Sequence, residues 1–213
     1  EPFSIPSGSM IPTLLVGDYL FVSKYSYGYS RFSFPFSAIP FKGRILGSEP
    51  KRGDVAVFKK PREERTDFIK RIVGMPGDRI QVRSGVLFVN GTPVKRDRIA
   101  DYVYADRYRQ GRVDTYMETL PNSAAHVIIE IEGDRGSSDN TEEFAVPAGH
   151  YFMMGDNRDN SSDSRADVGF VPFENLIGRA EFVFFSTDGT AALWEVWKWP
   201  FAIRYGRLLH GIR

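Results

Sequence analysis

Ser9 is the residue whose setting in this chain most strongly suggests chemistry. It lies between Gly8, which lets the backbone turn tightly, and Met10, whose apolar side chain can cover one flank. A serine in such a turn becomes a nucleophile once a neighbouring base takes its proton. Histidine is the usual base, but none of the 3 histidines lies in a motif-like setting. The sequence therefore predicts a nucleophilic serine that uses a different base.

Lys70 is the alternative base, and it lies in a stretch of β-forming residues. A lysine must lose its proton to act as a base, and its ordinary pKa is about 10.4. If residues 68–72 form a strand, Phe68 and Ile72 share a face with Lys70, and their apolar side chains can lower its pKa by excluding water. Lowering the pKa by about 3 pH units would cost about 4 kcal/mol of folding free energy at neutral pH. Taken alone, the stretch fits a surface lysine with a solvated head better than a buried base.

Four blocks of sequence bear on whether Lys70 is a surface lysine or a buried base. They are Ser7–Thr13 around the serine, Lys51–Phe58, Asp67–Asp78 around the lysine, and Gly155–Arg165. In this order they resemble the type I signal peptidases, which are membrane-bound serine proteases with a Ser-Lys dyad. The resemblance covers nearly the whole chain and is weakest at residues 83–145 and after Ser186. Together the blocks favour a buried lysine that acts as a base.

The resemblance implies roles for four residues. Ser9 would be the nucleophile and Lys70 the general base, so the chain would be a serine endopeptidase. Ser7 would add its hydroxyl to an oxyanion hole formed with the backbone N–H of Ser9, and each such donor is typically worth about 3 kcal/mol. Ser161 would orient the lysine amine, although a serine in an Asp/Asn/Ser-rich loop is commonly a turn residue.

Two ion pairs are also implied by the resemblance, Asp163 with Arg165 and Arg71 with Asp156. We expect both to support the site structurally rather than to take part in the chemistry. The sequence shows no clustered set of histidine and cysteine ligands. No metal and no cofactor are therefore expected.

The expected substrate is the signal peptide of a preprotein. Such peptides carry small residues at the first and third positions before the cut, so the site needs shallow apolar pockets and an edge strand that pairs with an extended chain. The prolines near the N-terminus fit an edge strand. We expect six residues to line the substrate site or to pack as a core cluster beneath it: Phe3, Ile5, Pro6, Met10, Phe68 and Ile69.

Composition limits the possible partners and location. The chain has 213 residues, 42% hydrophobic, with a net charge of +1 and no cysteine, so disulfides are excluded and nucleic acid is not an expected partner. The sequence contains no continuous run of about 18 or more apolar residues, which is the length needed to span a bilayer. Signal peptidases carry their membrane anchor upstream of the serine. We therefore interpret the chain as a catalytic region without its anchor, on the outer, periplasmic side of a bacterial plasma (inner) membrane.

Short β-forming runs bounded by Gly, Pro or Asp predict an all-β fold. The runs are Tyr19–Val22, Val55–Phe58, Arg79–Val82, Val127–Ile131 and Glu181–Phe185, and Asn90-Gly91 predicts a hairpin turn. This spacing favours antiparallel sheets, partly barrel-like, over βαβ units. We expect a catalytic β-domain of residues 1–82 plus 146–213 and a smaller inserted β-domain of residues 83–145.

Two aromatic segments indicate contact with a lipid bilayer surface or, alternatively, simple coverage of the core. Residues 194–201 hold all 3 tryptophans, and residues 25–41 hold several phenylalanines among serine and proline. Two other functions remain open at this point. One is a self-cleaving Ser-Lys repressor, although the sequence shows neither its Ala-Gly cleavage segment nor a helix-turn-helix. The other is a non-catalytic β-domain that binds peptides or membrane surfaces.

Overall fold

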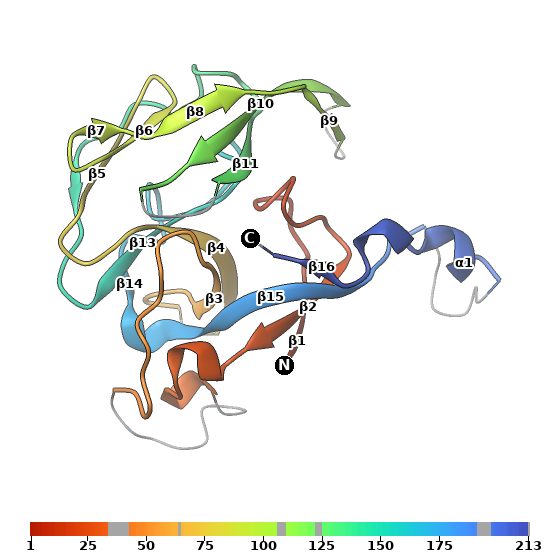
Figure 1. The fold of residues 1–213 in the computed structure, drawn as a ribbon, viewed down its shortest axis with the longest axis horizontal. Coiled ribbons are helices and arrows are strands. Elements are labelled where there is room, and N and C mark those ends of the chain that lie inside the picture. Colours follow the sequence, from red (N-terminus) through yellow and green to blue (C-terminus); the bar gives the residue numbers. More distant parts are fainter. Residues whose placement is uncertain (34–42, 64, 106–109, 122–124, 191–196, 213) are drawn as a thin grey trace.

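A computed structural model describes residues 1–33, 43–63, 65–105, 110–121, 125–190 and 197–212. In these residues the strands form three antiparallel sheets (Figure 1), and the α-helix α1 (Trp199–Ala202) is a single turn. The remaining helical elements are the short 3-10 helices η1 (Tyr25–Tyr27), η2 (Arg31–Ser33), η4 (Phe173–Asn175) and η5 (Tyr205–Arg207). The predicted all-β class with antiparallel sheets is confirmed.

The largest sheet has eight strands in the order β1-β2-β15-β3-β4-β13-β14, and β16 also pairs with β15. Their bounds are β1 (Pro2–Ser4), β2 (Asp18–Ser23), β3 (Val55–Lys59), β4 (Asp67–Gly74), β13 (His150–Met154), β14 (Val171–Pro172), β15 (Leu176–Ser186) and β16 (His210–Gly211). Strand β2 shows the alternation that builds the core, because Leu20 and Val22 are buried while Tyr19 and Phe21 face outward. The inward side chains pack with Val183 of β15 in one apolar cluster.

Two four-stranded sheets come from residues 79–145, and Figure 1 shows their yellow and green strands above the large sheet. One contains β5 (Arg79–Arg83), β6 (Val86–Val89), β7 (Thr92–Pro93) and β12 (Phe144–Ala145); the other contains β8 (Lys95–Arg98), β9 (Tyr102–Ala105), β10 (Gln110–Thr119) and β11 (Ala125–Glu130). The predicted hairpin joins β6 to β7, and Asn90 and Gly91 both have positive φ, at 53° and 77°. The proposed boundary between a catalytic and an inserted domain stays a prediction.

Strand β4 is the element that positions the predicted base. It pairs with β3 from Asp67 to Arg71, and β13 joins its other side only at Arg71 and beyond. Phe68 and Ile72 pack in one apolar cluster, whereas Ile69 and Val73 belong to two others. This arrangement agrees with the predicted alternation along the strand.

The two aromatic segments are described only in part. Of the first, Phe32 is buried, and residues 34–41 lie outside the described residues. Of the second, Trp197 is 65% exposed and Phe201 is 87% exposed, while Trp194 lies outside the described residues. Among the helices that can be described, none is both long and apolar enough to cross a membrane.

Candidate active site

The structure brings Ser9 and Lys70 together. Ser9 lies in the turn between β1 and β2, where the N–H of Ile11 donates to the carbonyl of Gly8 at 3.2 Å. Lys70 Nζ lies 2.6 Å from Ser9 Oγ and donates to the carbonyl of Ile69 at 3.0 Å. Both side chains are nearly enclosed, since Ser9 is 8% exposed and Lys70 is 3% exposed. A hydroxyl and an amine at this distance can exchange a proton directly.

Burial adjusts Lys70 for this exchange. It lowers the pKa of the amine from the ordinary 10.5 to about 8, because the charged form loses its water. The carboxylates of Asp163, Asp156 and Asp167 oppose the change but do not cancel it. The direction is the one expected from the sequence, and the pKa stays somewhat higher than anticipated. At neutral pH a minority of the molecules therefore hold a neutral amine.

The loop after β13 encloses the other side of the serine turn. The backbone N–H of Asn157 donates to the carbonyl of Ser9 at 3.1 Å, and its side-chain amide donates to the carbonyl of Gly8 at 3.0 Å. Gly155 permits this close approach, because a Cβ atom there would lie 2.5 Å from the Ser9 carbonyl oxygen. Sequence analysis did not single out Asn157, although it lies in one of the four blocks.

The two expected supporting serines differ in their surroundings. Ser161 is next to Gly155, since a Cβ on that glycine would overlap its hydroxyl. The Ser161 hydroxyl is buried and has no hydrogen-bond partner among the described residues, so the expected contact with the lysine amine is not made. Ser7 is exposed and lines the cleft beside Ser9.

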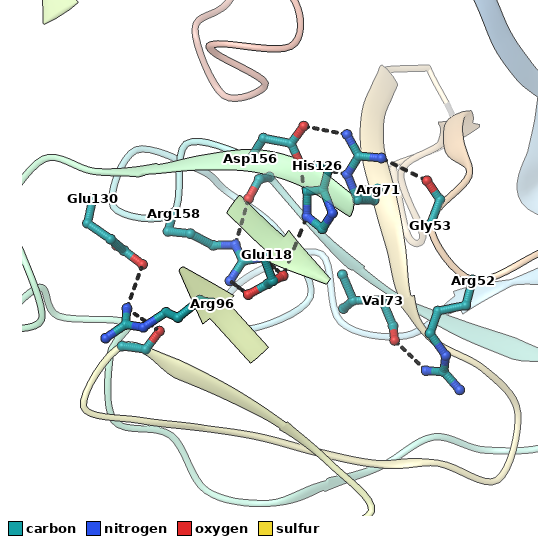
Figure 2. A network of polar contacts seen from close by, with 12 residues as sticks. Arg52, Gly53, Arg71, Val73, Arg96, Glu118, His126, Glu130, Asp156 and Arg158 are labelled. Atoms are coloured by element: carbon teal, nitrogen blue, oxygen red, sulfur yellow. Dashed lines mark hydrogen bonds and ion pairs between the residues drawn. The ribbon is translucent and has the colours of Figure 1, made fainter. Parts of the chain in front are cut away.

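Both expected ion pairs are present and buried. Arg71 binds Asp156 through two hydrogen bonds of 2.8 and 2.7 Å (Figure 2), and Arg165 binds Asp163 at 3.0 and 2.9 Å. Burial alone would raise the pKa of each carboxyl, but the paired arginine outweighs it and holds the pKa below the ordinary value. Asp163 also accepts the N–H of Gly155 at 3.0 Å. These pairs hold the backbone that surrounds the serine turn.

A further buried ionic group, besides the two expected ion pairs, was not predicted from the sequence. Glu118 of β10 pairs with Arg158, whose Nη1 lies 3.0 Å from Glu118 Oε2, and His126 Nε2 lies 3.4 Å from Glu118 Oε1 (Figure 2). Burial would raise the pKa of Glu118, but Arg158 and His126 outweigh it and lower it to about 2. Burial, followed by the charge of Arg71, lowers the pKa of His126. No local pattern marks a strand glutamate as the partner of an arginine 40 residues away.

A cleft of about 450 Å³ opens onto the serine and the lysine. Five of the six expected substrate residues line it: Phe3, Ile5, Pro6, Phe68 and Ile69. The sixth, Met10, is not among the lining residues; its side chain is 1% exposed and packs in the core with Leu14 and Leu20.

Comparison with known proteins shows the family of the chain. The family described as "Signal peptidase, peptidase S26" matches residues 1–185. A signal peptidase I of Rickettsia typhi (strain ATCC VR-144 / Wilmington) is 45% identical over 199 residues, which cover 89% of this chain and 74% of that protein. A signal peptidase I of Rickettsia prowazekii (strain Madrid E) is 44% identical over the same length and coverage.

Among solved structures, the crystal structure of a signal peptidase I from Enterococcus faecalis V583 is 25% identical, with a TM-score of 0.38, and covers 62% of this chain and 97% of that one. The family match and the two relatives each span most of the chain. The chain therefore belongs to the signal peptidase family, peptidase S26, and is a signal peptidase I, a serine endopeptidase that removes signal peptides.

Proposed function

We propose that Ser9 attacks the scissile carbonyl of the signal peptide with Lys70 as its general base. The observation that carries this proposal is the 2.6 Å separation of Lys70 Nζ and Ser9 Oγ in the cleft. When neutral, Nζ accepts the serine proton as Oγ forms a bond to the carbonyl carbon. The protonated amine then gives that proton to the departing amine of the peptide, which leaves an acyl-enzyme. Neutral Lys70 next takes a proton from water as the water attacks the ester carbonyl. The protonated amine then returns the proton to Ser9 Oγ as the bond to the acyl group breaks, which regenerates the free enzyme.

Two groups are proposed to stabilise the charge that develops on the carbonyl oxygen. The backbone N–H of Ser9 has no hydrogen-bond partner among the described residues, so it is free to donate. The exposed Ser7 hydroxyl lines the same cleft and supplies the second donor. Ser161 is proposed as a positioning residue whose buried hydroxyl is available to the lysine amine.

The substrate is proposed to add as an extended strand along the first half of β4. From Asp67 to Lys70 this strand has β3 on one side and no partner strand on the other, as far as the described residues show. An extended peptide can use such an edge for backbone hydrogen bonds. The cleft beside it, lined by Ile5, Phe68 and Ile69, would then receive small side chains before the cut.

The catalytic test compares Ser9→Ala with Ser4→Ala on one model preprotein. Ser9→Ala should lose at least about a thousand-fold in kcat/KM while keeping the wild-type unfolding temperature. Ser4 of β1 also lines the cleft, but the hydrogen bonds of Lys70 Nζ among the described residues go to Ser9 and Ile69 and not to Ser4, so Ser4→Ala should retain activity. A serine-reactive acylating probe should label the control but not the Ser9 variant. Turnover of Ser9→Ala above about a tenth of wild type would refute the assignment.

We further propose that the protein works on the outer face of a bacterial plasma membrane and contacts lipid through outward aromatic side chains. Tyr19, Phe21 and Phe184 are each 38–43% exposed on the outer face of β2 and β15, and the rings of Tyr19 and Phe184 lie 6.3 Å apart. Trp197 is also exposed, and aromatic residues favour the headgroup region. Sequence analysis predicted lipid contact at the tryptophans but missed this sheet face.

Vesicle binding tests the lipid proposal. Trp197 fluorescence should shift to the blue when vesicles are added, and a triple serine variant at Tyr19, Phe21 and Phe184 should bind vesicles more weakly. That variant should cleave a membrane-inserted preprotein more slowly and a soluble peptide at the wild-type rate. Val103→Ser is a matched control, because Val103 is 64% exposed on the remote strand β9. Equal losses on both substrates would show that the aromatic residues serve the fold or the cleft instead.

A further inference from the structure

Three carboxylates from residues 130–159 lie close together, and none of them lines the cleft. Glu130 ends β11, Asp139 lies in the loop that follows it, and Asp159 lies in the loop after β13. One oxygen from each residue lies within 4.8 Å of the other two. Glu130 and Asp139 are each only 1% exposed, so this is not a solvated acidic surface.

Each of the three residues has one buried oxygen that forms no hydrogen bond. These atoms are Glu130 Oε2, Asp139 Oδ1 and Asp159 Oδ1, and none has a partner among the described residues. The second oxygen of each aspartate is fixed by backbone, since Asp139 Oδ2 accepts the N–H of Gly136 and Asp159 Oδ2 that of Glu132, both at 2.6 Å. A buried, unpaired carboxylate oxygen is costly, so this arrangement lacks a donor or a cation.

The neighbouring arginines form hydrogen bonds with other carboxylates. Arg158 binds Glu118 and Arg165 binds Asp163, although the charges of both arginines act to lower the pKa values of the cluster. Arg96 Nη1 lies 4.0 Å from Glu130 Oε1 (Figure 2), but Nη2 of the same arginine binds Asp134 at 2.8 Å. In agreement, burial raises the pKa of Glu130 to about 9, and burial with the neighbouring carboxylates raises the pKa values of Asp139 and Asp159. Without a cation, at least one of the three carboxyls therefore keeps a proton at neutral pH.

The backbone leaves room for these oxygens. Gly136 lies against Asp159 Oδ1, and a Cβ atom at this position would overlap that oxygen. We propose that Glu130, Asp139 and Asp159 form a divalent-cation site best suited to Ca²⁺. Carboxylate oxygens are the ligands that hard cations prefer, and Ca²⁺ binds oxygens at about 2.3–2.6 Å, so two opposed ligands lie up to about 5 Å apart. Water and backbone carbonyls would complete the irregular coordination that Ca²⁺ accepts and Mg²⁺ does not.

A cation here would add to the backbone hydrogen bonds of Ile129 and the Glu118–Arg158 pair, which already join the small sheets to the loop after β13. Asp139 belongs to the loop between β11 and β12, whereas Asp159 lies two residues before Ser161 in the loop that clamps the Ser9 turn. Binding would therefore fasten the small sheets to the catalytic loop. This inference rests on the carboxylate cluster alone and does not depend on the roles assigned to Ser9 and Lys70.

Thermal unfolding of the whole chain near neutral pH tests the site, first in chelator and then with added Ca²⁺. At a free Ca²⁺ concentration of about 100 times the dissociation constant, the folding equilibrium should shift about a hundredfold, which raises the unfolding midpoint by about 5–10 °C in a chain of this size. Calorimetric titration should give one Ca²⁺ per chain. Mg²⁺ at the same ionic strength should give a smaller rise.

Asp139→Asn separates this proposal from a general salt effect. The asparagine can still accept the Gly136 N–H, and it removes one repelling charge, so in chelator the variant should be as stable as wild type or more stable. The unfolding midpoint of Asp139→Asn should no longer rise with Ca²⁺, and that of Glu130→Gln should not rise either. Asp97→Asn is the control, because Asp97 is an exposed acidic residue of β8 that pairs with Lys95 at 2.7 Å, and this variant should keep the response. No Ca²⁺ response in wild type, or an undiminished response in Asp139→Asn, would overturn the site.

Discussion

Replacing Lys70 with methionine should make the protein inactive and more stable at neutral pH. The folded state lowers the pKa of this amine from 10.5 to about 8. A difference of about 2.5 pH units corresponds to about 3 kcal/mol, at about 1.36 kcal/mol for each unit. Methionine keeps the apolar stem and removes this cost, but it also loses the hydrogen bonds to Ser9 and Ile69, worth about 1 kcal/mol. The expected net gain is about 2 kcal/mol, or about 4–8 °C in the unfolding midpoint.

The pH dependence of that gain identifies its cause. Below about pH 8 both folded and unfolded wild-type chains carry the proton, so the full cost of the buried charge is present. Between about pH 8 and 10.5 the folded protein binds fewer protons than the unfolded chain, so wild-type stability rises with pH relative to the variant. Above this window the gain should vanish, leaving only the lost hydrogen bonds.

The assay is thermal unfolding of both proteins near pH 7 and again above pH 10. Lys59→Met is the matched control, because Lys59 of the adjacent strand β3 is partly exposed and pairs with Asp67 at 2.7 Å. That variant should gain no stability at either pH. A Lys70→Met protein that is less stable than wild type at pH 7, or a gain of equal size at both pH values, would refute the buried-base reasoning.

Three further predictions follow from the same geometry. Because the neutral fraction of an amine with a pKa of about 8 rises about tenfold between pH 7 and 9, kcat/KM should rise about tenfold over that range and then level; a flat profile would contradict a lysine base. Gly155→Ala should lower kcat/KM at least about a hundredfold with little change in substrate binding, measured by steady-state kinetics, because its Cβ displaces the Ser9 carbonyl and Ser161. Arg71→Met should cost about 3–5 kcal/mol in denaturant unfolding, because Asp156 is left buried without its partner; a cost below about 1 kcal/mol would show that the pair is not needed.

The strands that were predicted best from the sequence are those that contain their own run of buried apolar residues. Val55–Phe58 falls within β3, and the run Glu181–Phe185 falls within β15. Strand β10, Gln110–Thr119, was not predicted, because charged residues interrupt its apolar ones. It forms because β8, β9 and β11 all pair with it. That stabilisation comes from distant segments, which local propensity does not report.

The site was predictable to the extent that short blocks of sequence define it. Such blocks pointed to Ser9 and Lys70 as the expected dyad, and the structure places Lys70 Nζ 2.6 Å from Ser9 Oγ. Met10 was expected either to line the substrate site or to pack in the core beneath it, and the structure places it in the core with Leu14 and Leu20. Glu118 and its buried partner Arg158 were not found, because whether a charge is buried depends on a partner elsewhere in the chain.

The clamp on the serine turn has a consequence for when the enzyme can become active. Ser9 and Lys70 are 61 residues apart in the chain, and the side chain of Asn157 reaches a carbonyl 149 residues away. Contacts between such distant residues close large loops and form only after much of the chain has been ordered. A nascent or partly folded molecule therefore carries both reactive groups without a working protease. If Ser9 and Lys70 act as proposed, proteolysis requires the loop that contains Asn157 to be in place, so activity should be lost when this loop detaches even while the sheets stay folded.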